Sequence, residues 1–243
     1  VVTPFLMLVC AWHSQDLLHV LPGLVFGGWL GWSGIWQRVP ATWTENAWRV
    51  APHLLFVAGC AVAYSAALYL YLQAPSELPS ASDDGVHYFR IATHMARDPG
   101  AFLSGRLDDE NFFSGYSLAM ALWFMLVGVH IPSWLMWHGL ACGTLSVAVY
   151  RLGTNLCGPA VGAAAGVWVI AHSVLLHLFA TFNMETFFIP LLYTALALWV
   201  SAKESEVTHP RTRSVWTGLL LGMATIFRPT SVLLPLWLVA ATR

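Results

Sequence analysis

Charged residues are scarce in this chain. Of its 243 residues only 9% are charged, whereas 58% are hydrophobic, and a soluble domain carries roughly 25% charged residues. Several uncharged runs reach the ~20 residues that a helix needs to cross a bilayer. The composition therefore excludes an ordinary soluble domain and predicts an all-α fold, a polytopic bundle of transmembrane helices.

Cysteine pairs and basic clusters are also lacking. The four cysteines lie in or beside apolar runs and form no CxxC pair. We therefore expect buried thiols, and neither a disulfide framework nor a metal site built on cysteine. The net charge is −1 and no basic cluster occurs, so nothing in the sequence indicates a nucleic-acid partner.

The apolar runs divide the chain into two parts. Residues 1–49 are expected to form extra N-terminal membrane helices and a short cytoplasmic connection, from Arg38 to Arg49. Residues 50–243 are expected to form the main transmembrane module, with 74–115 as its first extracytoplasmic loop. The chain ends directly after an apolar run, so we expect a fragment of a longer protein. The expected spans of the module include 50–73, 133–151, 158–180 and 186–202.

Acidic residues gather in the loop, where seven of the chain's 12 fall between Glu77 and Glu110. By the positive-inside rule, the basic residues that flank the spans should be cytoplasmic, and the loop and Glu185 should then lie outside. An odd number of spans must connect the loop to Arg151, whereas 116–129 and 133–151 would together make two. We therefore expect residues 116–129 to form a re-entrant or interfacial helix. The basic residues assigned to the cytoplasmic side are Arg38, Arg49, Arg151, Lys203, Arg211 and Arg213.

A short amphipathic helix is predicted inside the loop. Its apolar face follows helical spacing from Asp84 through Tyr88 to Met95, and His87 and Arg90 lie along a neighbouring face. We expect this helix to lie on the membrane with its apolar side down. Asp83 and Asp84 stand at its start, where acids favour the positive end of the helix dipole. A capping role and a catalytic role are both open for them.

Two isolated charges in apolar surroundings are further candidates. Glu185 follows 74 residues without another acid. It either neutralises a helix N-terminus or joins Asp84 in holding a divalent cation such as Mg²⁺ or Mn²⁺. Arg228 lies well inside an apolar run, where an Arg costs roughly 2.5–3.5 kcal/mol. We expect it to face a cavity and bind an anionic lipid phosphate, or else to snorkel or pair with another helix.

Glycine and histidine patterns receive structural interpretations. Gly158, Gly162 and Gly166 repeat every four residues, and such a stripe lets helices approach closely in lipid. His172 and His177 are expected in interfacial or polar-network positions. No role is expected for the two histidines that flank the predicted turn at Pro132, which are His130 and His138.

Four segments, in this order, resemble the GT-C superfamily of polytopic membrane glycosyltransferases. This superfamily includes protein O-mannosyltransferases, lipid A aminoarabinose transferases and GPI-type mannosyltransferases. The resemblance covers residues 83–235 and does not extend to 1–49, and Ser114 and Ser117 stand where the family usually has proline. The segments are Asp84-Gly85-x-x-Tyr88-Phe89-x-Ile91-Ala92, the run Phe112–Leu118, the run Met184–Phe188, and the run from Gly218 to Thr230 with Arg228-Pro229.

The resemblance implies transfer of a sugar from a polyprenyl-phosphate donor to an acceptor hydroxyl, with inversion, on the extracytoplasmic face. Asp84 matches the family's acidic position and is implied to be the general base. Asp83 would orient the acceptor or a metal ion, and Glu185 is the further catalytic candidate. The membrane would be a bacterial inner membrane or the endoplasmic reticulum, and the acceptor a protein, lipid or glycan. The residues implied to contact substrate are Arg228, Tyr88, His87, Arg90 and Tyr116.

Two other classes stay open at this point. A transporter or lipid flippase should show repeated halves with broken helices at the midplane, and no such repeat is seen in the sequence. A non-catalytic subunit that keeps the GT-C fold would share every motif. Transfer activity separates both from an enzyme.

Overall fold

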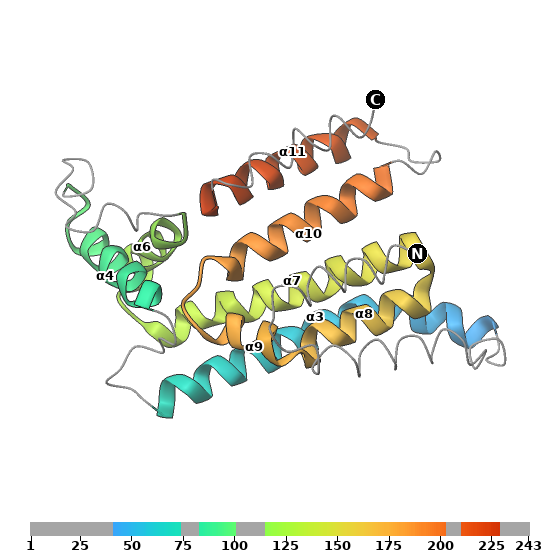
Figure 1. Cartoon of the computed structure of the whole chain (residues 1–243), viewed down its shortest axis with the longest axis horizontal. Coiled ribbons are helices and arrows are strands. Elements are labelled where there is room, and N and C mark those ends of the chain that lie inside the picture. Colours follow the sequence, from blue (N-terminus) through green and yellow to red (C-terminus); the bar gives the residue numbers. More distant parts are fainter. Residues whose placement is uncertain (1–40, 74–82, 101–114, 203–209, 229–243) are drawn as a thin grey trace.

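The structure is a computed structural model that describes residues 41–73, 83–100, 115–202 and 210–228. Over these residues the regular structure is entirely α-helical, which confirms the predicted all-α class (Figure 1). The helices are α3 (Ala41–Gln73), α4 (Asp83–Arg97), α6 (Gly115–Val127), α7 (Ile131–Cys157), α8 (Pro159–Ala171), α9 (Ser173–Ala180), α10 (Glu185–Ala202) and α11 (Pro210–Phe227).

Helices α3 and α7 are held together by glycines at close backbone contacts. A Cβ on Gly143 would lie 2.6 Å from the Phe56 carbonyl oxygen, and a Cβ on Gly139 would lie 2.9 Å from the Cys60 carbonyl oxygen. Toward the other end of the pair, the Tyr150 hydroxyl donates to the Trp48 carbonyl at 3.1 Å. Rising residue numbers in α3 thus face falling numbers in α7, so the two helices are antiparallel.

The segment predicted as one span over 158–180 is two helices. Gly158 has φ 94° and its N–H caps α7, so it ends that helix and does not extend the packing stripe. Gly162 and Gly166 do pack closely, against the backbone near Tyr150 and Ser146 respectively. The chain then bends by 55° between α8 and α9.

Helices α10 and α11 complete the bundle. The Arg213 guanidinium donates to the Ser201 carbonyl at 3.0 Å, and the Asn155 amide donates to the Ser201 hydroxyl at 2.7 Å. The end of α10 therefore lies by the end of α7 and the start of α11. We call this the basic end of the bundle, because Arg49, Arg151 and Arg213 lie there. The opposite end, where α10 starts and α11 ends, is called the site end (Figure 1).

Helices α4 and α6 pack together at the site end. α6 has 13 residues, fewer than the ~20 that cross a bilayer. The apolar face of α4 is buried within a cluster that includes residues of α6 and α7. The prediction that this face lies on the membrane was therefore wrong, since protein covers Tyr88, Ile91 and Met95. The helix itself, from Asp83, is as predicted.

Membrane-spanning character is clearest in α3. Within the described part of the chain, residues Ala47–Gln73 are the single stretch of helix that is both long and apolar enough to cross a bilayer. The bent pair α8–α9 is a second candidate if it acts as one span. α3 starts at Ala41, so the expected polar connection up to Arg49 is helical from that residue onward. The helices expected within 1–37 lie outside the described residues.

The cysteines depart partly from expectation. Cys142 is buried and Cys60 is half-buried, but Cys157 is exposed. The prediction that every thiol is buried was therefore wrong at Cys157.

Candidate functional site

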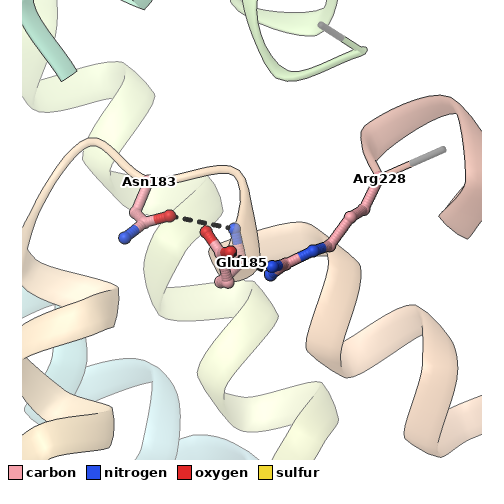
Figure 2. Close-up of polar contacts among 3 residues, drawn as sticks. All are labelled: Asn183, Glu185 and Arg228. Atoms are coloured by element: carbon pink, nitrogen blue, oxygen red, sulfur yellow. Dashed lines mark hydrogen bonds and ion pairs between the residues drawn. The ribbon is translucent and has the colours of Figure 1, made fainter. Parts of the chain in front are cut away.

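An ion pair lies at the site end of the bundle. The Arg228 guanidinium donates from Nη1 to Oε1 of Glu185 (Figure 2). Glu185 is the first residue of α10, and Arg228 directly follows the last residue of α11. The pair therefore joins the two helix ends, and the predicted alternative of a helix-pairing Arg describes part of what Arg228 does.

The backbone around Glu185 is fixed by its neighbours. The Asn183 side-chain oxygen accepts from the Glu185 N–H at 3.2 Å (Figure 2). The Thr186 hydroxyl donates back to the Leu178 carbonyl in α9 at 3.0 Å. The first bond satisfies an N–H at the start of α10 and the second a carbonyl in the last turn of α9, and together they fix the turn between α9 and α10.

Aromatic rings lie close to the pair. The Arg228 guanidinium carbon lies 5.8 Å from the centroid of the Phe188 ring, a cation–π distance. Phe187 stacks on Phe227 with centroids 5.6 Å apart. The planar cation is thus held between a carboxylate and an aromatic ring.

Tyr88 connects α4 to this pair. Burial, with the carboxylates of Asp84 and Glu185, raises the pKa of the Tyr88 phenol to about 12, and Arg228 opposes the shift. Charges influence a pKa over short distances, so Tyr88 lies near the Glu185–Arg228 pair at the site end. Asp84 lies one helical turn from Tyr88 on α4.

The other α4 candidates lie around this neighbourhood. Asp83 is the first residue of the helix and Asp84 is the second, with an exposed side chain. Arg90 is exposed and His87 is half-buried. The helix presents Asp84 and Arg90 to the surroundings while Tyr88 faces the protein.

Tyr116 is placed differently from its prediction as a substrate contact. Its side chain is 0% exposed. Its hydroxyl lies 2.9 Å from His138 Nε2 and accepts from Trp134 Nε1 at 3.1 Å. A side chain enclosed in this way cannot touch a substrate without unfolding of its surroundings, so the prediction was wrong. Tyr116 instead packs beneath the residues of the site.

His138 is the residue that sequence reasoning missed. It was expected to flank a turn, but it lies within α7, is 0% exposed, and has its Nδ1 2.9 Å from the Phe179 carbonyl. His130 does stand at the turn, where its side chain accepts from the Ser133 N–H as the N-cap of α7. A histidine inside an apolar run was the one signal available, because a buried imidazole requires hydrogen-bonding partners.

The residues of the site do not fit a divalent cation. Among the described residues no three His, Cys, Asp or Glu side chains come together as a metal-binding group. Glu185 accepts from Arg228, and the guanidinium charge would repel a cation at that carboxylate. The predicted Asp84–Glu185 metal site therefore has no support in the geometry.

Comparison of the chain with protein-family models, with curated proteins and with solved structures finds no match.

Proposed function

We propose that the chain is part of an integral membrane glycosyltransferase of the GT-C kind. It would move a sugar from a polyprenyl-phosphate donor to an acceptor hydroxyl on the extracytoplasmic face. The observation that carries the proposal is the gathering of Asp84 and Tyr88 from α4 with the Glu185–Arg228 pair at one end of the bundle. These positions come from three of the four motifs: Asp84 and Tyr88 lie in α4, Glu185 begins α10, and Arg228 directly follows α11.

The reaction assigns a distinct task to each charge. Asp84 accepts the proton of the acceptor hydroxyl as the acceptor oxygen attacks the anomeric carbon of the sugar. The bond between that carbon and the phosphate oxygen breaks, and the polyprenyl phosphate leaves with the electron pair. Arg228 stabilises the negative charge on the leaving phosphate, for which its planar fork is suited.

Glu185 acts in this scheme through Arg228. Because it accepts from Nη1, it restricts the orientations of the guanidinium, and the Phe188 ring restricts them further. A pre-oriented cation needs no reorganisation when charge develops on the phosphate. Glu185 is thus a positioning residue in the proposal, and the base is Asp84.

A polytopic arrangement in the membrane is part of the proposal. It is supported by the distribution of charge along the bundle, because Arg49, Arg151 and Arg213 lie at the basic end, whereas Arg228 at the site end is paired with Glu185. Under the positive-inside rule the basic end is cytoplasmic. The short helix α6 then stays at the outer side together with α4.

The direct test is sugar transfer by membranes that contain the protein, with polyprenyl-phosphate sugars as donors. Asp84→Asn should reduce transfer on the order of 10²- to 10⁴-fold, the usual contribution of a general base. Asp98→Asn is the matched control, because Asp98 is exposed and directly follows α4. Equal activity of Asp84→Asn and the unsubstituted protein would remove the base assignment.

One observation favours a transporter or flippase as the second candidate. The 55° break between α8 and α9 is the kind of discontinuous helix that transporters use at their binding sites. The same membranes decide between the two. Movement of the lipid-linked sugar across the bilayer, with no transfer to any acceptor, would favour the second candidate.

A further inference from the structure

A buried hydrogen-bond chain lies directly beneath the site. It runs from Trp134 to Tyr116, from Tyr116 to His138, and from His138 to the Phe179 carbonyl, with distances of 3.1, 2.9 and 2.9 Å. Tyr116 and His138 are both fully buried. This series of hydrogen bonds joins three helices, because Tyr116 belongs to α6, His138 to α7, and Phe179 to α9.

The chemistry of these groups fixes the direction of every hydrogen bond. The Phe179 carbonyl can only accept, so the proton of the neutral imidazole must be on Nδ1. His138 Nε2 then carries a lone pair and accepts from the Tyr116 hydroxyl. The Tyr116 oxygen in turn accepts from the Trp134 indole N–H, which can only donate. One tautomer of His138 therefore satisfies all four groups.

Two members of this series of hydrogen bonds, Tyr116 and Phe179, link it to elements that carry site residues. On one side, the Tyr116 ring packs against the edge of Tyr88 with centroids 5.5 Å apart, and Tyr88 lies one helical turn from Asp84 on α4. On the other side, Phe179 is adjacent to Leu178, whose carbonyl accepts from Thr186. Thr186 directly follows Glu185, so the same end of α9 holds both His138 and the start of α10.

Aromatic packing makes His138 the centre of this arrangement. Its ring meets Phe182 and Phe187 edge-on, with centroids 5.9 and 6.0 Å apart. Phe182 also stacks on Phe89 of α4 at 6.0 Å. A shift of the imidazole would therefore be transmitted both to α4 and to the turn between α9 and α10.

We propose that His138, as the neutral Nδ1–H tautomer, is a positioning residue that sets the placement of Asp84 relative to the Glu185–Arg228 pair. This inference rests on the proposed transferase function for its effect on rate, but its effect on geometry is independent of any activity. His138 itself touches neither the acceptor nor the donor. It acts by holding α6 and the end of α9 on α7.

Two substitutions separate the functions of the imidazole. His138→Phe keeps an aromatic ring and removes both hydrogen bonds. His138→Asn places an amide N–H near the position of Nδ1, and so keeps a donor for the Phe179 carbonyl while it loses the bond to Tyr116. Ser146→Ala is the matched control, because Ser146 is also buried on α7 but donates within its own helix to Cys142.

The first measurement is the distance distribution between spin labels on unnatural amino acids at His94 in α4 and Met223 in α11, both of which are exposed. We expect His138→Phe to broaden or shift this distribution, His138→Asn to restore it in part, and Ser146→Ala to leave it unchanged. The ring ¹⁵N shifts of His138, assigned by their loss in His138→Asn, should show a protonated Nδ1 and an unprotonated Nε2. An unchanged distribution in His138→Phe, or the opposite tautomer, would overturn the inference.

The second measurement is the rate of sugar transfer by the folded fraction of each variant. We expect kcat in His138→Phe to fall on the order of 10- to 100-fold, the consequence of a displacement of about 1 Å, with a less than roughly twofold change in the donor KM. A loss of folded protein with normal kcat in what remains would mean that His138 is structural only. If the unsubstituted protein transfers no sugar but the label distances still respond, the proposed function fails and the positioning role stands.

Discussion

The Arg228 guanidinium donates to the Glu185 carboxylate across 43 residues of chain and joins the end of α11 to the first residue of α10. The Arg228 side chain is 43% exposed and that of Glu185 is 19% exposed. A partly solvated pair of this kind contributes little to stability. Its main consequence is therefore the orientation of a guanidinium at the end of the bundle where Asp84 also lies.

Replacement of Arg228 should affect the reaction more than the fold. Arg228→Ala should lower kcat/KM for the polyprenyl-phosphate donor about 10- to 100-fold, since hydrogen bonds to charged groups contribute about 1.5–3 kcal/mol. Arg228→Lys should recover part of this loss, because it keeps the charge but not the planar fork. Arg151→Ala, exposed at the basic end, is the control. Equal losses in the two alanine variants would rule out a specific role for Arg228.

Reversal of the pair separates orientation from phosphate binding. In a double variant, Glu185→Arg with Arg228→Glu, the ion pair can form again with opposite polarity. Because the pair contributes little to stability, we expect the thermal stability of the double variant in detergent to stay close to that of the unsubstituted protein, whereas transfer stays low because a carboxylate now occupies the position of the guanidinium. Recovery of transfer in the double variant would show that the pair has no more than a structural task.

Tyr88 should make the folded protein sensitive to alkaline pH. Because its folded pKa is raised from 10.0 to about 12, the folded state holds the phenolic proton more tightly than the unfolded state does. The associated stability is complete below about pH 10 and is lost as the pH rises toward 12. Thermal unfolding at about pH 7 and about pH 11 should therefore show a smaller decrease in Tm for Tyr88→Phe than for the unsubstituted protein. Tyr69→Phe, on an exposed tyrosine of α3, should show the full decrease.

Local sequence features predicted the helices of the site end but not their contacts. The spacing from Asp84 to Met95 predicted α4 correctly, since amphipathic spacing is a property of one segment. It could not show that α6 would cover the apolar face, because α6 follows a loop of unknown path. Arg49 was assigned to a polar connection because of its charge. A charged residue does not end a helix, however, and Arg49 lies within α3.

Long-range pairings were the part that the sequence could not supply. Glu185 and Arg228 were each selected as isolated charges in apolar runs, and their pairing depends on the antiparallel course of α10 and α11. His138 bonds to the Phe179 backbone carbonyl, 41 residues away. Every residue has such a carbonyl, so the sequence does not indicate which one is the partner. Tyr116 was misassigned for the same reason, because its burial follows from the packing of α4 and α7 around it.

The close contact between α3 and α7 should depend on Gly143. A Cβ there would meet the Phe56 carbonyl oxygen at 2.6 Å, and the helices would have to separate. We expect Gly143→Ala to destabilise the protein by about 1–3 kcal/mol, as is usual for overpacking. Gly218→Ala in α11 is the control, since a Cβ there meets nothing within 4 Å and alanine favours the helix by about 0.5–1 kcal/mol. Chemical unfolding in detergent compares the two, and equal effects would contradict the contact.

The placement of α6 at the outer side of the membrane can be tested by cysteine labelling. In the proposed topology Asp98, after α4, and Val129, between α6 and α7, lie on the same extracytoplasmic side, whereas the native, exposed Cys157 lies at the basic end. A membrane-impermeant maleimide added to intact cells or sealed vesicles should therefore label Asp98→Cys and Val129→Cys. Cys157 should react only after permeabilisation, and the unsubstituted protein measures its background. If α6 crosses the bilayer, Val129→Cys will instead be protected, and Cys157, at the other end of α7, will react without permeabilisation. Glu185 and Asp84 will then lie on opposite faces, where they cannot share a substrate.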